Sequence, residues 1–151
     1  MGNGCITMIG HEQTTVSVQP KPTMLTESHG QLCVVWHGRE PPTEAEWESH
    51  LREMRKLRSR PLKVLVMSEG GAPSPSQQLR LTPIISSSSV VIAVVSDTIG
   101  VRLVVSSLAL FTRRIRTFRR GELALAHVHL GLDADETRFA NAFARRVNAL
   151  T

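Results

Sequence analysis

The sequence predicts an α/β fold in which a mostly parallel sheet of four to five strands is flanked by helices. Two observations support this prediction. Val90–Val95 is a continuous apolar run rich in β-branched residues, as expected for a central strand that is buried on both faces. Cap-type residues then lead directly into the apolar segment Ile99–Phe111. A strand followed by such a helix needs packed layers on both sides of the sheet.

The N-terminal segment is expected to lead into two strands. Met1–Gln13 is glycine-rich and lacks a hydrophobic period, so we expect residues 1–13 to be flexible. Thr14–Gln19 alternates polar and apolar residues, which predicts an edge strand that prolines end. Lys21–Gly30 is interpreted as a loop, and Gln31–His37 as a strand.

The next element is an amphipathic helix that begins with a capping box of Thr43 and Glu46. Its apolar residues recur at helical spacing and predict one buried face: Trp47, Leu51, Met54 and Leu57. Basic residues collect in its last turn, where they complement the helix dipole. We interpret them as a solvated helix end, with a contact to an acidic partner as the alternative.

Leu62–Met67 is the next predicted strand, and Ser68–Pro73 is a loop at its carboxyl end. A helix is expected to begin at Ser74, because a serine, a proline and a glutamine follow one another at capping positions. Pro83 should end or kink this helix, and Ile84–Ser89 is interpreted as a polar link to the next strand.

The last third of the chain predicts a short strand and two helices. Ile115–Phe118 is the strand, and Leu123–Leu130 is a short helix that ends at a glycine. Asp133 begins another capping box and an amphipathic helix. The predicted organisation is therefore an α/β domain over residues 14–132 with an added C-terminal helix over residues 133–151.

Composition limits the function classes. The formal net charge of +5 permits an anionic partner. The chain lacks an aromatic platform or a recognisable reading helix, so we do not expect nucleic acid. Two cysteines are too few for a disulfide framework, and Cys33 is expected to be buried. No apolar run reaches the roughly 18–20 residues of a membrane span, and no signal-peptide pattern opens the chain, which favours a cytoplasmic protein.

A resemblance to a known family comes from the run VVSDTIGVRLVVSSLALFTRRIRTFRRGELALAHVHLGL. This run is similar to the STAS superfamily, nearest its bacterial SpoIIAA-like (STAS/SEC14-type) branch. There, a strand like Val94–Asp97 enters an apolar helix, a short strand ends in phenylalanine as at Phe118, and a small helix begins near a glutamate as at Glu122. The resemblance covers roughly Thr14–Leu132. It implies a mostly parallel sheet and a protein that binds proteins, nucleotides or lipids rather than catalysing reactions.

The resemblance also implies a serine that can be phosphorylated at the start of the helix after the third strand. Ser74 and Ser76 occupy that place, although the family's Asp-Ser-Ser-Gly-like sequence is absent. A phosphate at a helix N-terminus is electrostatically favoured and could switch an interface. The alternative is that Ser74 only caps its helix.

Polar residues follow two predicted strands, at the sheet edge where open α/β sheets bind ligands. They are the candidate ligand or anion loop: Ser68, Glu69, Gly70, Gly71, Ser96 and Asp97. Backbone N–H groups of the glycine loop could hold an anion, whereas Asp97 could simply cap a helix. No nucleophile–base pair, cofactor motif or metal-ligand spacing is recognisable. We therefore assign no catalytic residue and no metal, and we expect neither enzyme activity nor a cofactor.

Excess apolar surface on Ile99–Phe111 gives the leading functional hypothesis, which is a regulatory or scaffolding domain acting through protein–protein contacts. Such a surface marks an interface with a partner or a second copy, unless the C-terminal helix covers it. The candidate interface residues are Val105, Leu108, Phe111, Phe139 and Phe143. The alternative is binding to a lipid or an anionic membrane surface through a basic patch of Arg113, Arg114, Arg116, Arg119 and Arg120.

Overall fold

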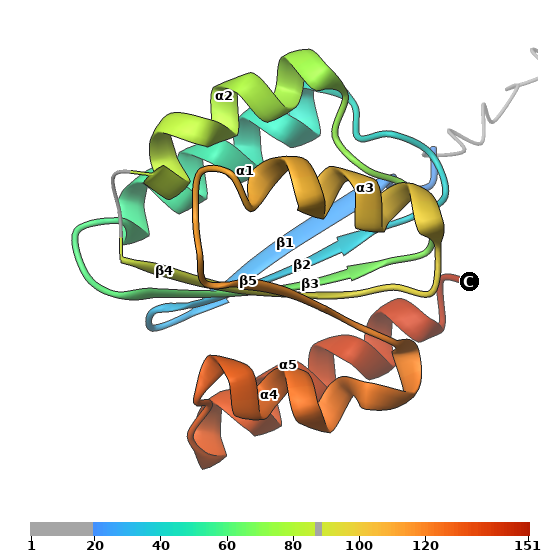
Figure 1. The fold of residues 1–151 in the computed structure, drawn as a ribbon. Coiled ribbons are helices and arrows are strands. Elements are labelled where there is room, and N and C mark those ends of the chain that lie inside the picture. The colour runs from blue at the N-terminus through green and yellow to red at the C-terminus, as the bar shows by residue number, and fades with distance from the viewer. Residues whose placement is uncertain (1–19, 87–88) are drawn as a thin grey trace, which may run out of the picture.

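The computed structural model describes residues 20–86 and 89–151. The described part has an α/β fold with one five-stranded sheet between two layers of helices (Figure 1). The elements, in chain order, are β1 (Met24–His29), β2 (Leu32–His37), α1 (Glu44–Leu57), β3 (Leu62–Ser68), α2 (Pro75–Ser86), β4 (Val90–Val95), α3 (Ile99–Leu108), β5 (Ile115–Phe118), the 3-10 helix η1 (Arg120–Glu122), α4 (Leu123–Leu130) and α5 (Ala134–Asn148).

The strands lie in the order β1-β2-β3-β4-β5. The β1–β2 pair is antiparallel, and the three other pairs are parallel. The prediction of a mostly parallel sheet is therefore confirmed. The position of Val90–Val95 differs from the expectation, because β3 occupies the middle of the sheet and β4 lies beside it. Every residue of β4 is nevertheless buried, since both of its faces are covered by helices.

Helices α1, α2 and α3 cover one face of the sheet, and α4 and α5 cover the other (Figure 1). Each face has its own core. Val35, Val64 and Ile92 point into the first core, whereas Val34, Leu65 and Ala93 point into the second. This alternation is what the two-residue period of a strand requires when both faces are buried.

The segment that was interpreted as a loop at Lys21–Gly30 contains strand β1, so that interpretation was wrong. Residues Met24–His29 have a polar sequence, MLTESH, with no clear apolar alternation. The polar side chains are accommodated because α1 offers them partners. Thr26 Oγ1 lies 3.3 Å from His50 Nδ1, and the Ser28 hydroxyl donates to Glu53 at 2.7 Å. The edge strand expected at Thr14–Gln19 and the flexible segment expected at residues 1–13 lie outside the described residues.

Helix α2 also differs from the expectation, because it continues through Pro83 to Ser86. Ile84 and Ile85 are part of this helix rather than of a polar link. Both side chains are buried in the core under the α1–α3 layer. Burial of these two side chains offsets the backbone hydrogen bond that a proline cannot make.

Helix starts follow the capping signals closely. The capping boxes at Thr43 and Asp133 are both present, which confirms these two predicted helix starts. At Thr43 the partner carboxylate of Glu46 also accepts hydrogen bonds from the backbone N–H groups of Thr23 and Met24, each at 3.0 Å. One side chain therefore caps α1 and fixes the beginning of β1. Helix α3 ends at Leu108, three residues before the predicted end at Phe111.

Candidate binding site

The carboxyl ends of the parallel strands bring polar residues from separate parts of the chain together. In the β2–β3 register His37 pairs with Ser68, the last residue of each strand. Ser96 follows β4 and is also buried. The backbone N–H of Glu69 donates to the carbonyl of His37 at 2.9 Å, and that of Ser96 donates to Phe118 at 2.9 Å. Backbone hydrogen bonds therefore hold the carboxyl ends of neighbouring strands together at this edge.

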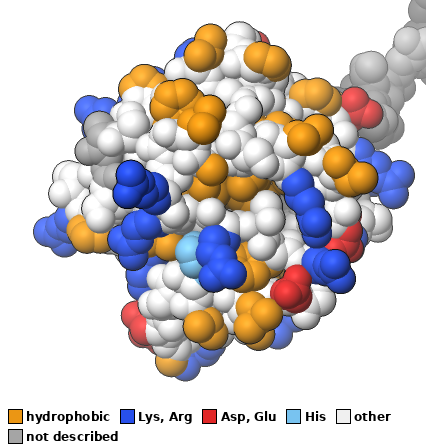
Figure 2. Space-filling view, in the orientation of Figure 1, with side chains coloured by type: hydrophobic (Ala, Val, Ile, Leu, Met, Phe, Trp, Pro, Cys, Tyr) orange, Lys and Arg blue, Asp and Glu red, His pale blue; other side chains and the backbone are white. Residues whose placement is uncertain are grey.

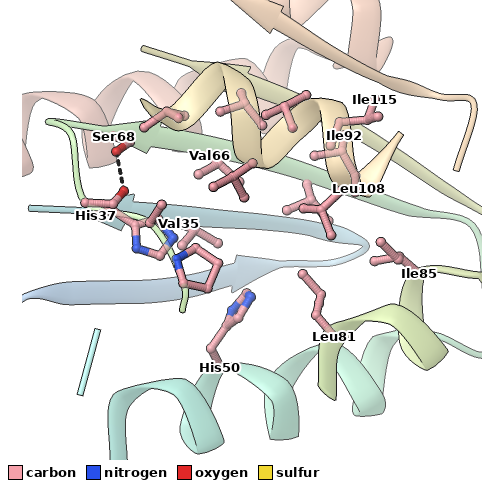
Figure 3. A pocket seen from close by; sticks show the side chains of 18 of the residues that line it. Val35, His37, His50, Val66, Ser68, Leu81, Ile85, Ile92, Leu108 and Ile115 are labelled. Carbon is pink, nitrogen blue, oxygen red and sulfur yellow. Dashed lines mark hydrogen bonds between the residues drawn. The ribbon is translucent and has the colours of Figure 1, made fainter. Parts of the chain in front are cut away.

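The glycine loop after β3 uses its backbone donors internally. The Gly70 N–H donates to Ser68 Oγ at 3.1 Å, and the Gly71 N–H donates to the Gly38 carbonyl at 2.8 Å. The Ser68 hydroxyl donates to the Gly71 carbonyl at 2.6 Å (Figure 3). In this arrangement the N–H groups of residues 69–71 are occupied and are not offered to an anion.

The acidic residues of the same edge are held by one arginine. The Arg120 guanidinium pairs with the Glu69 carboxylate at 3.0 Å, and the Arg120 backbone N–H donates to Asp97 at 3.1 Å. Asp97 therefore ties the start of η1 to the end of β4, instead of capping α3. Thr98 is the N-cap residue of α3, but its side chain makes no capping hydrogen bond.

Ser74 and Ser76 lie at the start of α2. The Ser74 hydroxyl accepts from the Gln77 N–H at 3.2 Å, and the Gln77 side-chain oxygen accepts from the Ser74 N–H at 2.8 Å. Ser74 is thus the helix cap, as one of the two sequence interpretations had it. Ser76 is exposed, and its hydroxyl lies 3.2 Å from that of Ser74. The two hydroxyls are close enough for a modification of either to change the cap.

A further candidate site is a cavity between the sheet and the α1–α3 layer. The sequence pattern gave no sign of it. Strand and helix side chains line it, mostly aliphatic, and at one end stand the buried imidazoles of His37 and His50 (Figure 3). Burial lowers the pKa of His37 to about 4, although nearby Glu46 acts in the opposite direction. Burial, and to a smaller degree His37, lower the pKa of His50 to about 3. Both rings are therefore neutral near pH 7.

The two histidines differ in their partners. His50 Nδ1 lies within hydrogen-bonding distance of Thr26 Oγ1. His37 Nδ1 is buried and has no partner among the described residues. No described hydrogen bond joins Ser68 or Ser96 to either histidine, because Ser68 bonds to the glycine loop and Ser96 Oγ lies 3.1 Å from the Thr98 hydroxyl. The serines and histidines thus do not form a nucleophile–base pair.

The outer side of α3 carries a row of exposed apolar side chains. Ile99 is 77% and Leu103 66% exposed, and just beyond the helix Leu110 is 83% and Phe111 49% exposed. Figure 2 shows hydrophobic side chains on the molecular face that includes the α1–α3 layer. Ile99 and Leu103 are four positions apart and fall on the same side of α3, and Leu110 follows two residues beyond the end of the helix. We call these three exposed side chains the stripe.

The alternative that the C-terminal helix covers this stripe is wrong. Helix α5 lies on the opposite face of the sheet, where its apolar side packs against β2 and β1 (Figure 1). Of the candidate interface residues, Val105 and Leu108 face the first core and Phe143 faces the second, so all three are buried. Phe111 is exposed, and Phe139 is half-buried beside the His29 ring, with ring centroids 5.1 Å apart.

The five arginines of the basic patch are all exposed. Arg120 pairs with Glu69, and the Arg116 guanidinium lies 5.6 Å from the centre of the Phe118 ring. Within the described residues, Arg113, Arg114, Arg116 and Arg119 have no ion pair. Figure 2 shows arginine and lysine side chains across the middle of this face, with hydrophobic side chains both above and below them.

Cys33 is buried as expected, and burial raises the pKa of its thiol to about 12. Over residues 20–86 and 89–151 no cluster of histidine, cysteine and carboxylate side chains is arranged to hold a metal ion. No helix in these same ranges is long and apolar enough to cross a membrane.

One of the two histidines on α4 has a backbone partner, because His129 Nε2 lies 3.1 Å from the Ile92 carbonyl oxygen.

No family model, no curated protein and no solved structure matches the chain. The fold itself creates two candidate functional features, the cavity and the uncovered face of α3.

Proposed function

We propose that this protein is a STAS-like, non-catalytic regulatory or scaffolding domain that associates with a second copy of itself through the outer face of α3. The observation that carries the proposal is the uncovered stripe of Ile99, Leu103 and Leu110. A helix packed on a sheet needs only one apolar side, and contiguous exposed apolar surface marks a contact site.

A second copy is the partner that suits this face best. Between Ile99 and Thr112 the only charged residue is Arg102, so two copies meet with little like-charge repulsion. In an antiparallel arrangement of the two α3 helices, Leu103 can face the small, exposed Ser107 of the second copy. Large side chains then meet small ones, which permits close packing. A two-fold contact of this kind is the commonest form of self-association.

The test is the molar mass of the full chain, measured by light scattering over a hundred-fold dilution. The unchanged chain should pass from dimer to monomer on dilution. Leu103→Lys should be monomeric throughout, because it buries a charge in the contact. Val128→Lys is the matched control, since Val128 is 76% exposed on the opposite helical layer and should leave the dimer intact. A monomer at every concentration would refute self-association.

A second candidate function is binding to an anionic membrane surface. It is favoured by Arg113 and Arg114, which have no ion pair within the described residues and follow the exposed Leu110 and Phe111 in the chain. Basic residues next to exposed apolar side chains bind anionic lipid at the headgroup level. Flotation with vesicles tests this candidate. Binding should require anionic lipid, weaken with salt and fail in the Arg113→Glu, Arg114→Glu double variant, while Arg145→Glu on α5 should have no effect. Equal binding to neutral vesicles, or none, would exclude this function.

A further inference from the structure

The cavity between the sheet and the α1–α3 layer has an almost wholly aliphatic lining. Valine and isoleucine side chains of β2, β3 and β4 face leucine, isoleucine and valine side chains of α2 and α3 across it, and no acidic or basic side chain other than histidine lines it. The cavity has a volume of about 60 Å³, counted as the space that the centre of a water molecule can reach. Since one water needs about 10–15 Å³ by this measure, the cavity has room for roughly five water-sized groups.

The polar groups of the cavity lie together at one end. Figure 3 shows His37, His50 and Ser68 on one side and the aliphatic Ile85, Leu108 and Ile115 on the other. Ser68 already bonds to Gly71, and His50 has Thr26. His37 is only 5% exposed, and its Nδ1 is unpartnered within the described residues. A buried polar atom without a partner is destabilising, so a hydrogen bond from a bound molecule would be favourable there.

We propose that this cavity is a binding site for a small, uncharged, aliphatic molecule with one hydroxyl group, and that this hydroxyl group hydrogen-bonds to His37 Nδ1 while the carbon chain lies against the aliphatic end. The lining selects for an uncharged ligand, because no side chain is present to pair with a charge. A hydroxyl suits His37 in either tautomer, because it can both donate and accept. The size of the cavity selects for a short chain.

This inference does not depend on the proposed self-association. The cavity is lined by the inner side of α3, including Val101 and Val105, whereas the dimer contact uses Ile99, Leu103 and Leu110 on the outer side. Failure of ligand binding and failure of dimer formation are therefore separate results.

The test is a titration of the full chain with n-pentanol, followed by NMR of labelled methyl groups. Val35, Ile85 and Ile92 report on the cavity, and Leu125 and Val128 on exposed α4 serve as internal controls. Two probes with the same number of non-hydrogen atoms complete the set: n-hexane lacks the hydroxyl, and n-pentylammonium carries a charge. We expect saturable shifts of the cavity methyl groups with n-pentanol and with n-hexane, and no binding of n-pentylammonium.

Two variants locate the site. His37→Phe keeps a planar ring but removes both nitrogens, so it should weaken n-pentanol binding about tenfold and leave n-hexane binding within about twofold, since one hydrogen bond is lost. Val66→Leu adds bulk at a cavity-lining position and should weaken both probes, whereas Val128→Leu on α4 should weaken neither. An n-pentanol affinity that His37→Phe leaves unchanged would overturn the assignment of His37. A lack of saturable cavity shifts with every probe would overturn the site itself, leaving a cavity that holds water only.

Discussion

The two buried histidines make folding stability sensitive to mild acid. His37 and His50 have pKa values of about 4 and about 3 in the folded protein, lowered chiefly by burial. In the unfolded chain each would titrate near 6.5. The unfolded state therefore binds more protons between these values, so stability is fully present above about pH 6.5 and is lost as the pH falls. When the pH falls from about 8 to about 5, each histidine should lower the free energy of unfolding by about 2 kcal/mol, and the pair should lower it by about 4 kcal/mol.

A loss of this size is large against the roughly 5–15 kcal/mol of a typical domain. The free energy of unfolding can be measured by urea titration at the two pH values, with the fluorescence of the buried Trp36 and Trp47 as the signal. Other groups also titrate in this range, so the decisive quantity is the difference between His37→Phe and the unchanged chain. Relative to the unchanged chain, the free energy of unfolding of His37→Phe should rise by about 2 kcal/mol when the pH falls from 8 to 5.

The matched control is Val66→Ala, which changes the same cavity without removing a titratable group. Its destabilisation should be the same at both pH values. His37→Phe should also be no less stable than the unchanged chain at pH 8, because the imidazole that it removes has an unpartnered Nδ1. Identical acid sensitivity of His37→Phe and the unchanged chain would refute the argument, since it would mean that His37 is not kept neutral by its surroundings.

Two further predictions concern the backbone around the same edge. Gly71→Ala should destabilise the fold by about 3 kcal/mol or more in urea titration, because the added Cβ would lie 2.4 Å from the Glu40 carbonyl and 2.5 Å from that of Gly38. Gly100→Ala is its control, since nothing lies within 4 Å of the new Cβ, and it should stabilise α3 by about 0.5–1 kcal/mol; equal effects would contradict the close approach at Gly71. Glu46→Gln should cost about 2 kcal/mol, because the carboxylate accepts hydrogen bonds from Thr23, Met24 and Thr43, and these outweigh partial burial to lower its pKa to about 2. The exposed Glu40→Gln should change stability by less than about 0.5 kcal/mol, and an equal loss in both variants would show that the anchoring contacts of Glu46 are unimportant.

The sequence predicted those parts of the fold whose cause is local. The capping boxes at Thr43 and Asp133, and the apolar run at Val90–Val95, need only neighbouring residues to be recognised. Strand β1 was not recognised, because its identity depends on pairing with β2 and on polar partners that α1 supplies. The side of the sheet on which α5 packs was likewise hidden, since an amphipathic helix fits either face.

The cavity could not be predicted for the same physical reason. His37 ends a strand and His50 lies inside a helix, with no motif joining them. Only the stacking of α1 on the sheet brings both imidazoles to one cavity. Position at a strand's carboxyl end was the one available signal, and it drew attention to Ser68, beside His37 in the register, rather than to His37 itself.

Helix α3 explains why the most apolar segment of the chain leads to two separate sites. Its inner side chains Val101, Val105 and Leu108 lie in the first core, and the partly buried Val104 packs against it. Folding therefore does not require apolar residues at Ile99, Leu103 and Leu110. An exposed leucine contributes little to stability, because it is not removed from water on folding. Under dilute conditions in which the unchanged chain is monomeric, Leu103→Lys should therefore unfold at the same urea concentration. A destabilised Leu103→Lys monomer would mean that the outer stripe serves the fold, and its loss of self-association would then say nothing about a contact surface.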